Sequence, residues 1–193
     1  MPWETKFNID NAIDQAMNVF WAKGYKSTSL NDLLDAMEIN KGSFYNTFGS
    51  KKELFTKALN RYEQRFRTNL LDHLTSFNDP VLAINTFFDL IIEHSTNDPE
   101  KKGCLIFNIA TDLPNHDDDT IDTVKNCFKD TTAFIKGLLE KGVSSKLINQ
   151  EIDITATSKA LLAAAVSIRV LSRGVMEKDD LLSIKTQALR LIK

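Results

Sequence analysis

The chain has 193 residues and a formal net charge of −2, with 42% hydrophobic, 9% aromatic and 26% charged residues. This length allows one large domain or two small ones, and the composition is that of a globular protein rather than a disordered one. The small negative charge excludes a uniformly basic nucleic-acid binder, so any basic surface must be local.

The sequence predicts an all-α fold, because its prolines lie outside the periodic runs and no stretch alternates as a set of strands would. The first helix is expected to begin at Asn8 or Asp10 and to end at Gly24. Its buried stripe consists of Ile13, Ala16, Met17 and Phe20. This helix is expected to brace the elements that follow it.

A short second helix is predicted from apolar residues that recur at helical spacing. Leu30, Leu33, Leu34 and Met37 fall at i, i+3, i+4 and i+7, which predicts one buried face. Thr28 or Ser29 can supply the N-cap oxygen. A turn at Glu38 and Ile39 then ends the helix.

The third predicted helix, KGSFYNTF, has Asn40 as its cap and Gly49 as its end. Helical spacing places Phe44 and Phe48 on one side and leaves a small, polar outer face suited to phosphates and base edges. A capping box, Ser50-Lys51-Lys52-Glu53, follows with two lysines at a helix start. Together these elements indicate a helix-turn-helix.

The remainder is predicted to be helical as well. A fourth helix runs from Ser50 to about Ser76, and later elements are expected from Asp79-Pro80, from Asp98-Pro99 to Pro114, from Asp117 to Gly142, from Asp153 or Thr155, and from Asp179 or Asp180. The last two helices carry apolar stripes that favour a four-helix dimer interface. Packing within a single chain is the alternative.

Charge is segregated along the chain. Residues 23–67 carry nine Lys/Arg and five Asp/Glu, a balance of +4, whereas residues 68–135 carry four and twelve, a balance of −8. A basic head on an acidic body is compatible with DNA binding through one end. Solvated surface charge without a function is the alternative.

The segment from about Ile9 to Leu59 resembles the DNA-binding domain of the TetR family of transcriptional regulators. The resemblance rests on Phe20, Gly24 and Tyr25 at the end of the first helix, on Thr28, and on Lys41-Gly42-Ser43-Phe44-Tyr45 with Phe48 and Lys51. Glu38 departs from the pattern, because the family usually has Gly there and a left-handed non-glycine costs roughly 1–2 kcal/mol.

The resemblance implies a helix-turn-helix domain at residues 1–50 and a larger helical ligand-binding and dimerisation domain at residues 51–193, joined by its first helix. It also implies a homodimer through the last two helices, a palindromic double-stranded DNA operator and a small-molecule effector. We predict a ligand- or redox-responsive repressor. The alternative is a small-molecule-binding helical protein with a non-functional DNA-binding head.

Candidate site residues follow from these assignments. The predicted DNA contacts are Lys41, Gly42, Ser43, Tyr45 and Asn46, with Thr28 and Lys51 on phosphates. Asn46 is the first candidate for base readout, because it lies most directly opposite the two phenylalanines. The predicted effector cavity is lined by Phe87, Phe88, Ile91, Phe107, Phe128, Phe134 and Ile135, which also fit an ordinary helical core.

Cys104 is a candidate redox sensor. The run Gly103-Cys104-Leu105 resembles a pattern in a subset of TetR-like regulators, some of which sense electrophiles or oxidants through a cysteine. Lys101 and Lys102, near a predicted helix start, would lower the pKa of the thiol. The alternative is an inert, buried thiol.

Enzymatic and membrane functions are not expected. The histidines His73, His94 and His116 share no metal-ligand spacing and no phosphate-cradling glycine loop is present, so we predict no catalytic residue, metal or cofactor. The opening MPWETKFNID has no apolar core of a signal peptide, and no run of 18 or more apolar residues could span a bilayer. We therefore expect a cytoplasmic protein without membrane contact.

Overall fold

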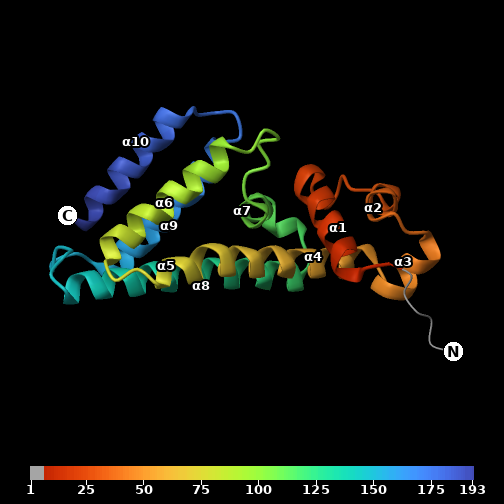
Figure 1. The fold of residues 1–193 in the computed structure, drawn as a ribbon, viewed down its shortest axis with the longest axis horizontal. Coiled ribbons are helices and arrows are strands. Elements are labelled where there is room, and N and C mark those ends of the chain that lie inside the picture. Colours follow the sequence, from red (N-terminus) through yellow and green to blue (C-terminus); the bar gives the residue numbers. More distant parts are fainter. Residues whose placement is uncertain (1–6) are drawn as a thin grey trace.

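The computed structural model describes residues 7–193, and within that range it contains helices and no strands, which confirms the predicted all-α fold. The predicted helix-turn-helix forms the head at one end of the molecule (Figure 1). It consists of α1 (Ile9–Lys23), α2 (Leu30–Met37) and α3 (Lys41–Phe48). Residues 1–6 of the predicted first domain lie outside the described range.

One helical rod leads from the head into the rest of the molecule, which we call the body (Figure 1). The rod consists of α4 (Lys51–Phe66), a π-helical segment (Arg67–Asp72) and α5 (His73–Thr75). Its end is within one residue of the predicted end at Ser76. A displacement of the body can therefore be transmitted to the head through continuous backbone.

The body contains α6 (Pro80–Thr96), α7 (Leu105–Ala110), α8 (Asp118–Ser144), α9 (Ile154–Leu171) and α10 (Lys178–Ala188), with short 3-10 turns at Leu113–Asn115 and Leu189–Ile192. The long helix α8 packs alongside α4, and α9 packs against α6, α8 and α10 (Figure 1). The head and α10 lie toward opposite ends of the molecule (Figure 1).

The helix starts of the head form as the sequence predicts. The side chain of Asn8 caps α1 by accepting the amide of Asn11 at 3.0 Å. Ser29 begins α2 in a reciprocal capping box with Asp32, and Asn40 caps α3. Each cap satisfies an amide that the helix itself leaves unpaired.

The core of the head is aromatic. Phe20, Phe44, Phe48 and Phe55 are almost fully buried, and the rings of Phe20 and Phe55 meet edge to face at 4.9 Å. Burial of one such side chain contributes about 1.5–3 kcal/mol. This core fixes α3 on α1 and α4 and thereby determines which side of α3 faces outward.

The rod is fastened to α1 by charged side chains as well as by this core. Arg61 of α4 donates to Asp14 at 2.9 Å and to Asp10 at 3.0 Å, and Arg65 donates to Asp14 at 2.7 Å. Burial raises the pKa of Asp14, but the two arginines outweigh it and the pKa is lowered. The head therefore moves with α4.

Two predicted helix boundaries were wrong. The helix expected from Asp98-Pro99 begins only at Leu105, because the Asp98 carboxylate accepts the amides of Glu100 and Lys102 and the chain turns through positive φ at Lys101 and Gly103. Gly142 does not end α8, which continues to Ser144. A Cβ on Gly142 would lie 2.3 Å from Ile148, so this glycine permits a close approach instead.

The helix α9 resembles a membrane span in length and composition alone. Its mean hydropathy is 1.5 over the 18 residues Ile154–Leu171. Lys159 and Arg169 interrupt the apolar residues, so the sequence contains no run of 18 apolar residues here. A third of α9 is buried inside the structure. The core helix of a globular protein passes the same test, so this resemblance is weak evidence for a membrane function.

Candidate nucleic-acid interface

The helix α3 separates an anchoring side from an outward side. Phe44 and Phe48 are buried, at 0% and 2% exposure, while Lys41, Gly42 and Asn46 are exposed. Tyr45 is 48% exposed despite its aromatic ring, and Ser43 is half-buried. The structure therefore brings the five predicted α3 residues together on one accessible surface.

The start of α4 lies next to this surface in the chain. Ser50 accepts the amide of Glu53 at 3.1 Å, while its own amide donates to the Phe48 carbonyl at 2.8 Å rather than to Glu53. One half of the predicted capping box is therefore formed. The remaining first-turn amides give the helix start a partial positive charge that favours an anion such as phosphate.

The two predicted phosphate contacts outside α3 differ in accessibility. The ammonium of Lys51 lies 4.5 Å from the centre of the Tyr25 ring, and burial lowers its pKa, partly opposed by the charge of Asp32. Thr28 is 1% exposed and its hydroxyl donates to the Gly24 carbonyl at 2.7 Å. A phosphate contact from the Thr28 side chain would require this hydrogen bond to open.

Ion pairs join the head and the start of α4 to the part of the chain before and at the start of α8, which sequence analysis did not predict. Lys52 lies 3.4 Å from both Asp117 and Asp119, and Lys26 lies 3.5 Å from Asp112. Hydrogen bonds to Asp117 and Asp119 raise the pKa of Lys52. Asp117 also caps α8, as predicted, by accepting the amide of Thr120. The segregation of charge along the chain was the available signal for these contacts.

A buried histidine completes this head–body junction. The ring of His116 lies 6.1 Å from the rings of both Tyr25 and Phe55, and its side chain is 6% exposed. Burial lowers the pKa of His116, opposed by the neighbouring Asp112 carboxylate. Its buried Nδ1 has no hydrogen-bond partner among the described residues. Sequence analysis had considered this histidine only as a metal ligand.

The side chains predicted to line an effector cavity lie in the body. Phe87, Phe88, Ile91, Phe107 and Ile135 are buried, whereas Phe128 and Phe134 are partly buried against the same core. The rings of Phe107 and Phe128 are 5.2 Å apart. The structure therefore places all of them in one packed apolar cluster.

Cys104 precedes α7 and is 5% exposed. The Tyr62 hydroxyl is hydrogen-bonded to it, and burial together with this thiol raises the pKa of Tyr62, while the charge of Arg169 lowers it. Lys102, which we expected to activate the thiol, forms an ion pair with Glu100 at 2.7 Å. Arg169 is thus the cation whose charge acts on Tyr62.

Two family models match the chain. The model described as bacterial regulatory proteins, tetR family, covers residues 12–58, and the model described as tetracyclin repressor-like, C-terminal domain, covers residues 80–183. The HTH-type transcriptional regulator YezE of Bacillus subtilis is 28% identical over 178 residues, which are 91% of each chain. The transcriptional repressor ComR of Escherichia coli is 27% identical over 96% of this chain and 89% of its own.

Solved structures have the same fold. A cysteine-substituted form of the TetR family regulator CifR, in complex with 26-base-pair operator DNA, matches 96% of this chain and 97% of its own with a TM-score of 0.82 at 24% identity. The reduced form of NemR from E. coli matches 98% of both chains with a TM-score of 0.84 at 16% identity. These likenesses concern the fold alone.

Proposed function

The chain belongs to the TetR family of transcriptional regulators, and we propose that it is a homodimeric repressor that binds a palindromic DNA operator through α3. It is a regulator of transcription and not an enzyme. In this proposal the operator is released when a small molecule binds the body or when a thiol is modified. The head comprises residues 1–50, the body comprises residues 51–193, and the protein acts in the cytoplasm.

The outward face of α3 is the observation that carries this proposal. A helix held by two buried phenylalanines presents Lys41, Tyr45 and Asn46 to solvent, where they have no structural task in the core. The Asn amide can pair with both hydrogen-bonding groups of an adenine edge in the major groove. Lys41 and the start of α4 supply the positive charge that phosphates require.

An apolar surface on α9 and α10 supports dimerisation through these helices. Ala160 and Ala164 of α9, with Ile184 and Leu191 beyond them, line a shallow groove, and Leu191 is 45% exposed. The small alanines permit a second helix to approach closely, and only a third of α9 is buried within one chain. A second copy on this face would give two α3 helices, which reach successive major grooves when they are about 34–36 Å apart.

A binding titration at several salt concentrations tests the proposal. The DNA flanking the protein's own gene is compared with random DNA of equal length, and light scattering measures the mass of the free protein. We expect a dimer that prefers one flanking sequence and loses affinity with salt at a slope of about −0.9 per phosphate contacted. If the flanking DNA is not preferred, selection from a random library follows. A library that yields no preferred sequence contradicts the proposal and favours a small-molecule-binding protein with a non-functional head.

A further inference from the structure

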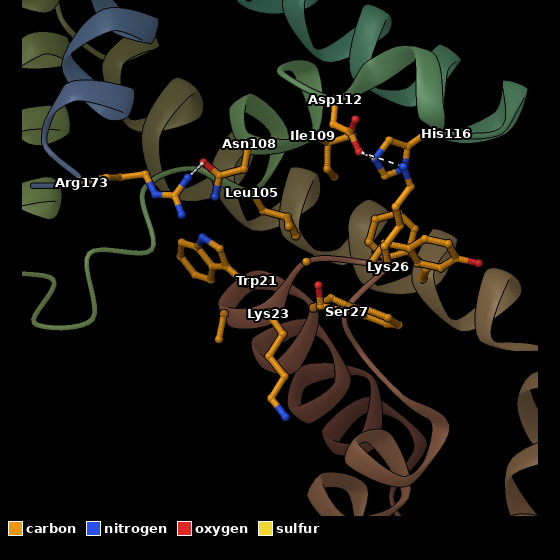
Figure 2. Close-up of a pocket in the computed structure, with 15 residues that line it drawn as sticks. Trp21, Lys23, Lys26, Ser27, Leu105, Asn108, Ile109, Asp112, His116 and Arg173 are labelled. Carbon is orange, nitrogen blue, oxygen red and sulfur yellow. Dashed lines mark hydrogen bonds and ion pairs between the residues drawn. The ribbon is translucent and has the colours of Figure 1, made fainter. Parts of the chain in front are cut away.

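A cavity of about 340 Å³ lies between the head and the body (Figure 2). Its head wall consists of the end of α1 and the loop after it, and its body wall consists of α7, the turn before α8 and the segment after α9. The volume is within the range of small-molecule sites. None of the seven core residues predicted to bind an effector lines it, so this is a different site.

Two buried nitrogens in the cavity wall have no hydrogen-bond partner among the described residues. They are Nε1 of Trp21 and Nδ1 of His116. The nitrogen-bearing edge of the Trp21 indole points toward the side of the cavity where Arg173 and Asn108 lie (Figure 2). A buried N–H without an acceptor costs about 1–3 kcal/mol, so a ligand oxygen at this position would be stabilised.

Arg173 brings a second set of donors to the same side. Its Nε donates to the Lys101 carbonyl at 3.2 Å and its Nη1 donates to the Asn108 side-chain oxygen at 3.1 Å. These two bonds orient the guanidinium and use only part of its five N–H groups. The free N–H groups and the indole N–H are together suited to a carboxylate, which accepts several hydrogen bonds.

The charge and the apolar surface of the cavity define the rest of the ligand. Two cations of its lining are already paired, Lys23 with Asp32 at 2.6 Å and Lys26 with Asp112 at 3.5 Å, whereas Arg173 is paired with no carboxylate among the described residues. The wall also contains the polar side chains Ser27, Asn108 and His116 and the aromatic and aliphatic side chains Phe20, Tyr25, Phe55, Leu105 and Ile109. The lining therefore favours a flat apolar group that ends in a negative charge.

We propose that this cavity binds small aromatic carboxylates, with the carboxylate between Trp21 and Arg173 and the ring against Leu105. Because its walls come from both the head and the body, an occupant changes their relative position and weakens operator binding. The effect on operator binding rests on the proposed function, whereas the binding site itself does not.

The site can be tested without DNA. The chain has two tryptophans, so the full-length Trp3→Phe variant leaves Trp21 as the single tryptophan, whose fluorescence is excited selectively over that of the three tyrosines. It is titrated with benzoate, with the uncharged benzamide and with benzylamine, which carries a positive charge. We expect saturable quenching by benzoate below about 1 mM and binding of the other two at least tenfold weaker. Equal responses to all three probes, or none to benzoate, would overturn the proposal.

Substitutions locate the binding. In calorimetry, Trp21→Phe keeps the ring but removes the N–H, and Arg173→Met removes the guanidinium; each should weaken benzoate binding about tenfold. Lys178→Met, at the exposed start of α10 outside the cavity, is the matched control and should bind like the parent. Circular dichroism confirms that each variant is folded. Parent-like affinity in both cavity variants would place benzoate elsewhere and overturn the site.

DNA binding then separates the two proposals. Benzoate should lower operator affinity, and operator DNA should lower benzoate affinity by the same factor. Benzoate binding without any operator leaves the site in place and rejects the proposed function. Operator binding that benzoate does not change rejects the coupling between this cavity and the head.

Discussion

The ammonium of Lys52 lies 3.4 Å from a carboxylate oxygen of Asp117 and thereby joins the first turn of α4 to the N-cap of α8. The Lys52 side chain is 47% exposed, and its second partner, Asp119, is 72% exposed. Water and salt screen such pairs strongly. The contact therefore contributes more to the orientation of the head than to the stability of the fold.

A double-mutant cycle between Lys52→Gln and Asp117→Asn tests this view. Asn is itself a good N-cap, so the start of α8 is retained while the charge is removed. We expect a small coupling free energy in urea unfolding, and a smaller one at high salt. A large coupling free energy that salt does not reduce would show that the pair is effectively buried, contrary to this account.

The buried imidazole of His116 predicts a pH dependence of stability. Burial lowers its folded-state pKa below the ordinary value of about 6.5, so at mildly acidic pH the unfolded chain binds more protons than the folded one. The contribution of neutral His116 to the free energy of unfolding is therefore complete above a pH of about 6.5. It is lost as the pH falls from there toward the folded-state pKa.

Urea unfolding of the parent, His116→Gln and His94→Gln at several pH values checks this prediction. The glutamine at position 116 cannot titrate, so the free energy of unfolding of that variant should fall less steeply with pH below a pH of about 6.5. His94 is exposed in the last turn of α6, and its variant is the matched control for the loss of a histidine away from the junction. An unchanged slope in His116→Gln would contradict the assignment.

The features that the sequence predicted correctly depend on residues that lie close together in the chain. The caps at Asn8 and Asn40 need only an amide three residues away, and the outward face of α3 follows from the spacing of Phe44 and Phe48. Helical periodicity alone therefore placed the candidate DNA surface correctly on the exposed side of its helix.

The features that it missed depend on residues far apart in the chain. Nothing near Lys52 identifies Asp117 as its partner, and the burial of Thr28 depends on how α1 and α2 pack. The start of α7 was wrong because the turn after Asp98 satisfies the backbone without a helix. The cavity beside Trp21 exists only after the head has met the body.

Asn46→Ala is expected to change sequence preference rather than general affinity. The amide is the α3 group best placed to read a base, so its removal should cost about 1–3 kcal/mol on the preferred operator and little on random DNA. Competition titrations with both DNAs measure the difference. An equal loss of affinity for both DNAs would mean that Asn46 contacts the phosphate backbone and not a base.

Lys51→Ala should instead weaken binding to every sequence and reduce the salt slope by about 1. The matched control is Lys125→Ala, which removes the same charge from the exposed side of α8 in the body. The measurement is the operator affinity over a series of salt concentrations. If the two variants have the same slope as the parent, the Lys51 ammonium stays on the Tyr25 ring and contacts no phosphate.

Glu38 predicts a simple stabilising substitution. It ends α2 in the left-handed region, with φ 56° and ψ 39°, and its side chain is exposed. Glu38→Gly should raise the free energy of unfolding by about 1 kcal/mol, because glycine adopts this conformation without the steric cost. Glu38→Ala retains the Cβ and serves as the control. A similar gain in both variants would mean that the glutamate charge, and not the backbone, is the source of the strain.

Cys104→Ser tests the proposed thiol sensor. Hydrogen peroxide adds an oxygen to the sulfur of Cys104. This residue is 5% exposed and its thiol is hydrogen-bonded to Tyr62, so the packing of α4 against α7 must change. We expect peroxide to weaken operator binding at least tenfold in the parent and in Cys127→Ser, the second buried cysteine, but not in Cys104→Ser. Intact-mass measurements follow the added oxygen in the same samples. Release that persists in Cys104→Ser would exclude this thiol as the sensor, and oxidation of Cys104 without release would show that the site accommodates the oxygen without moving the head.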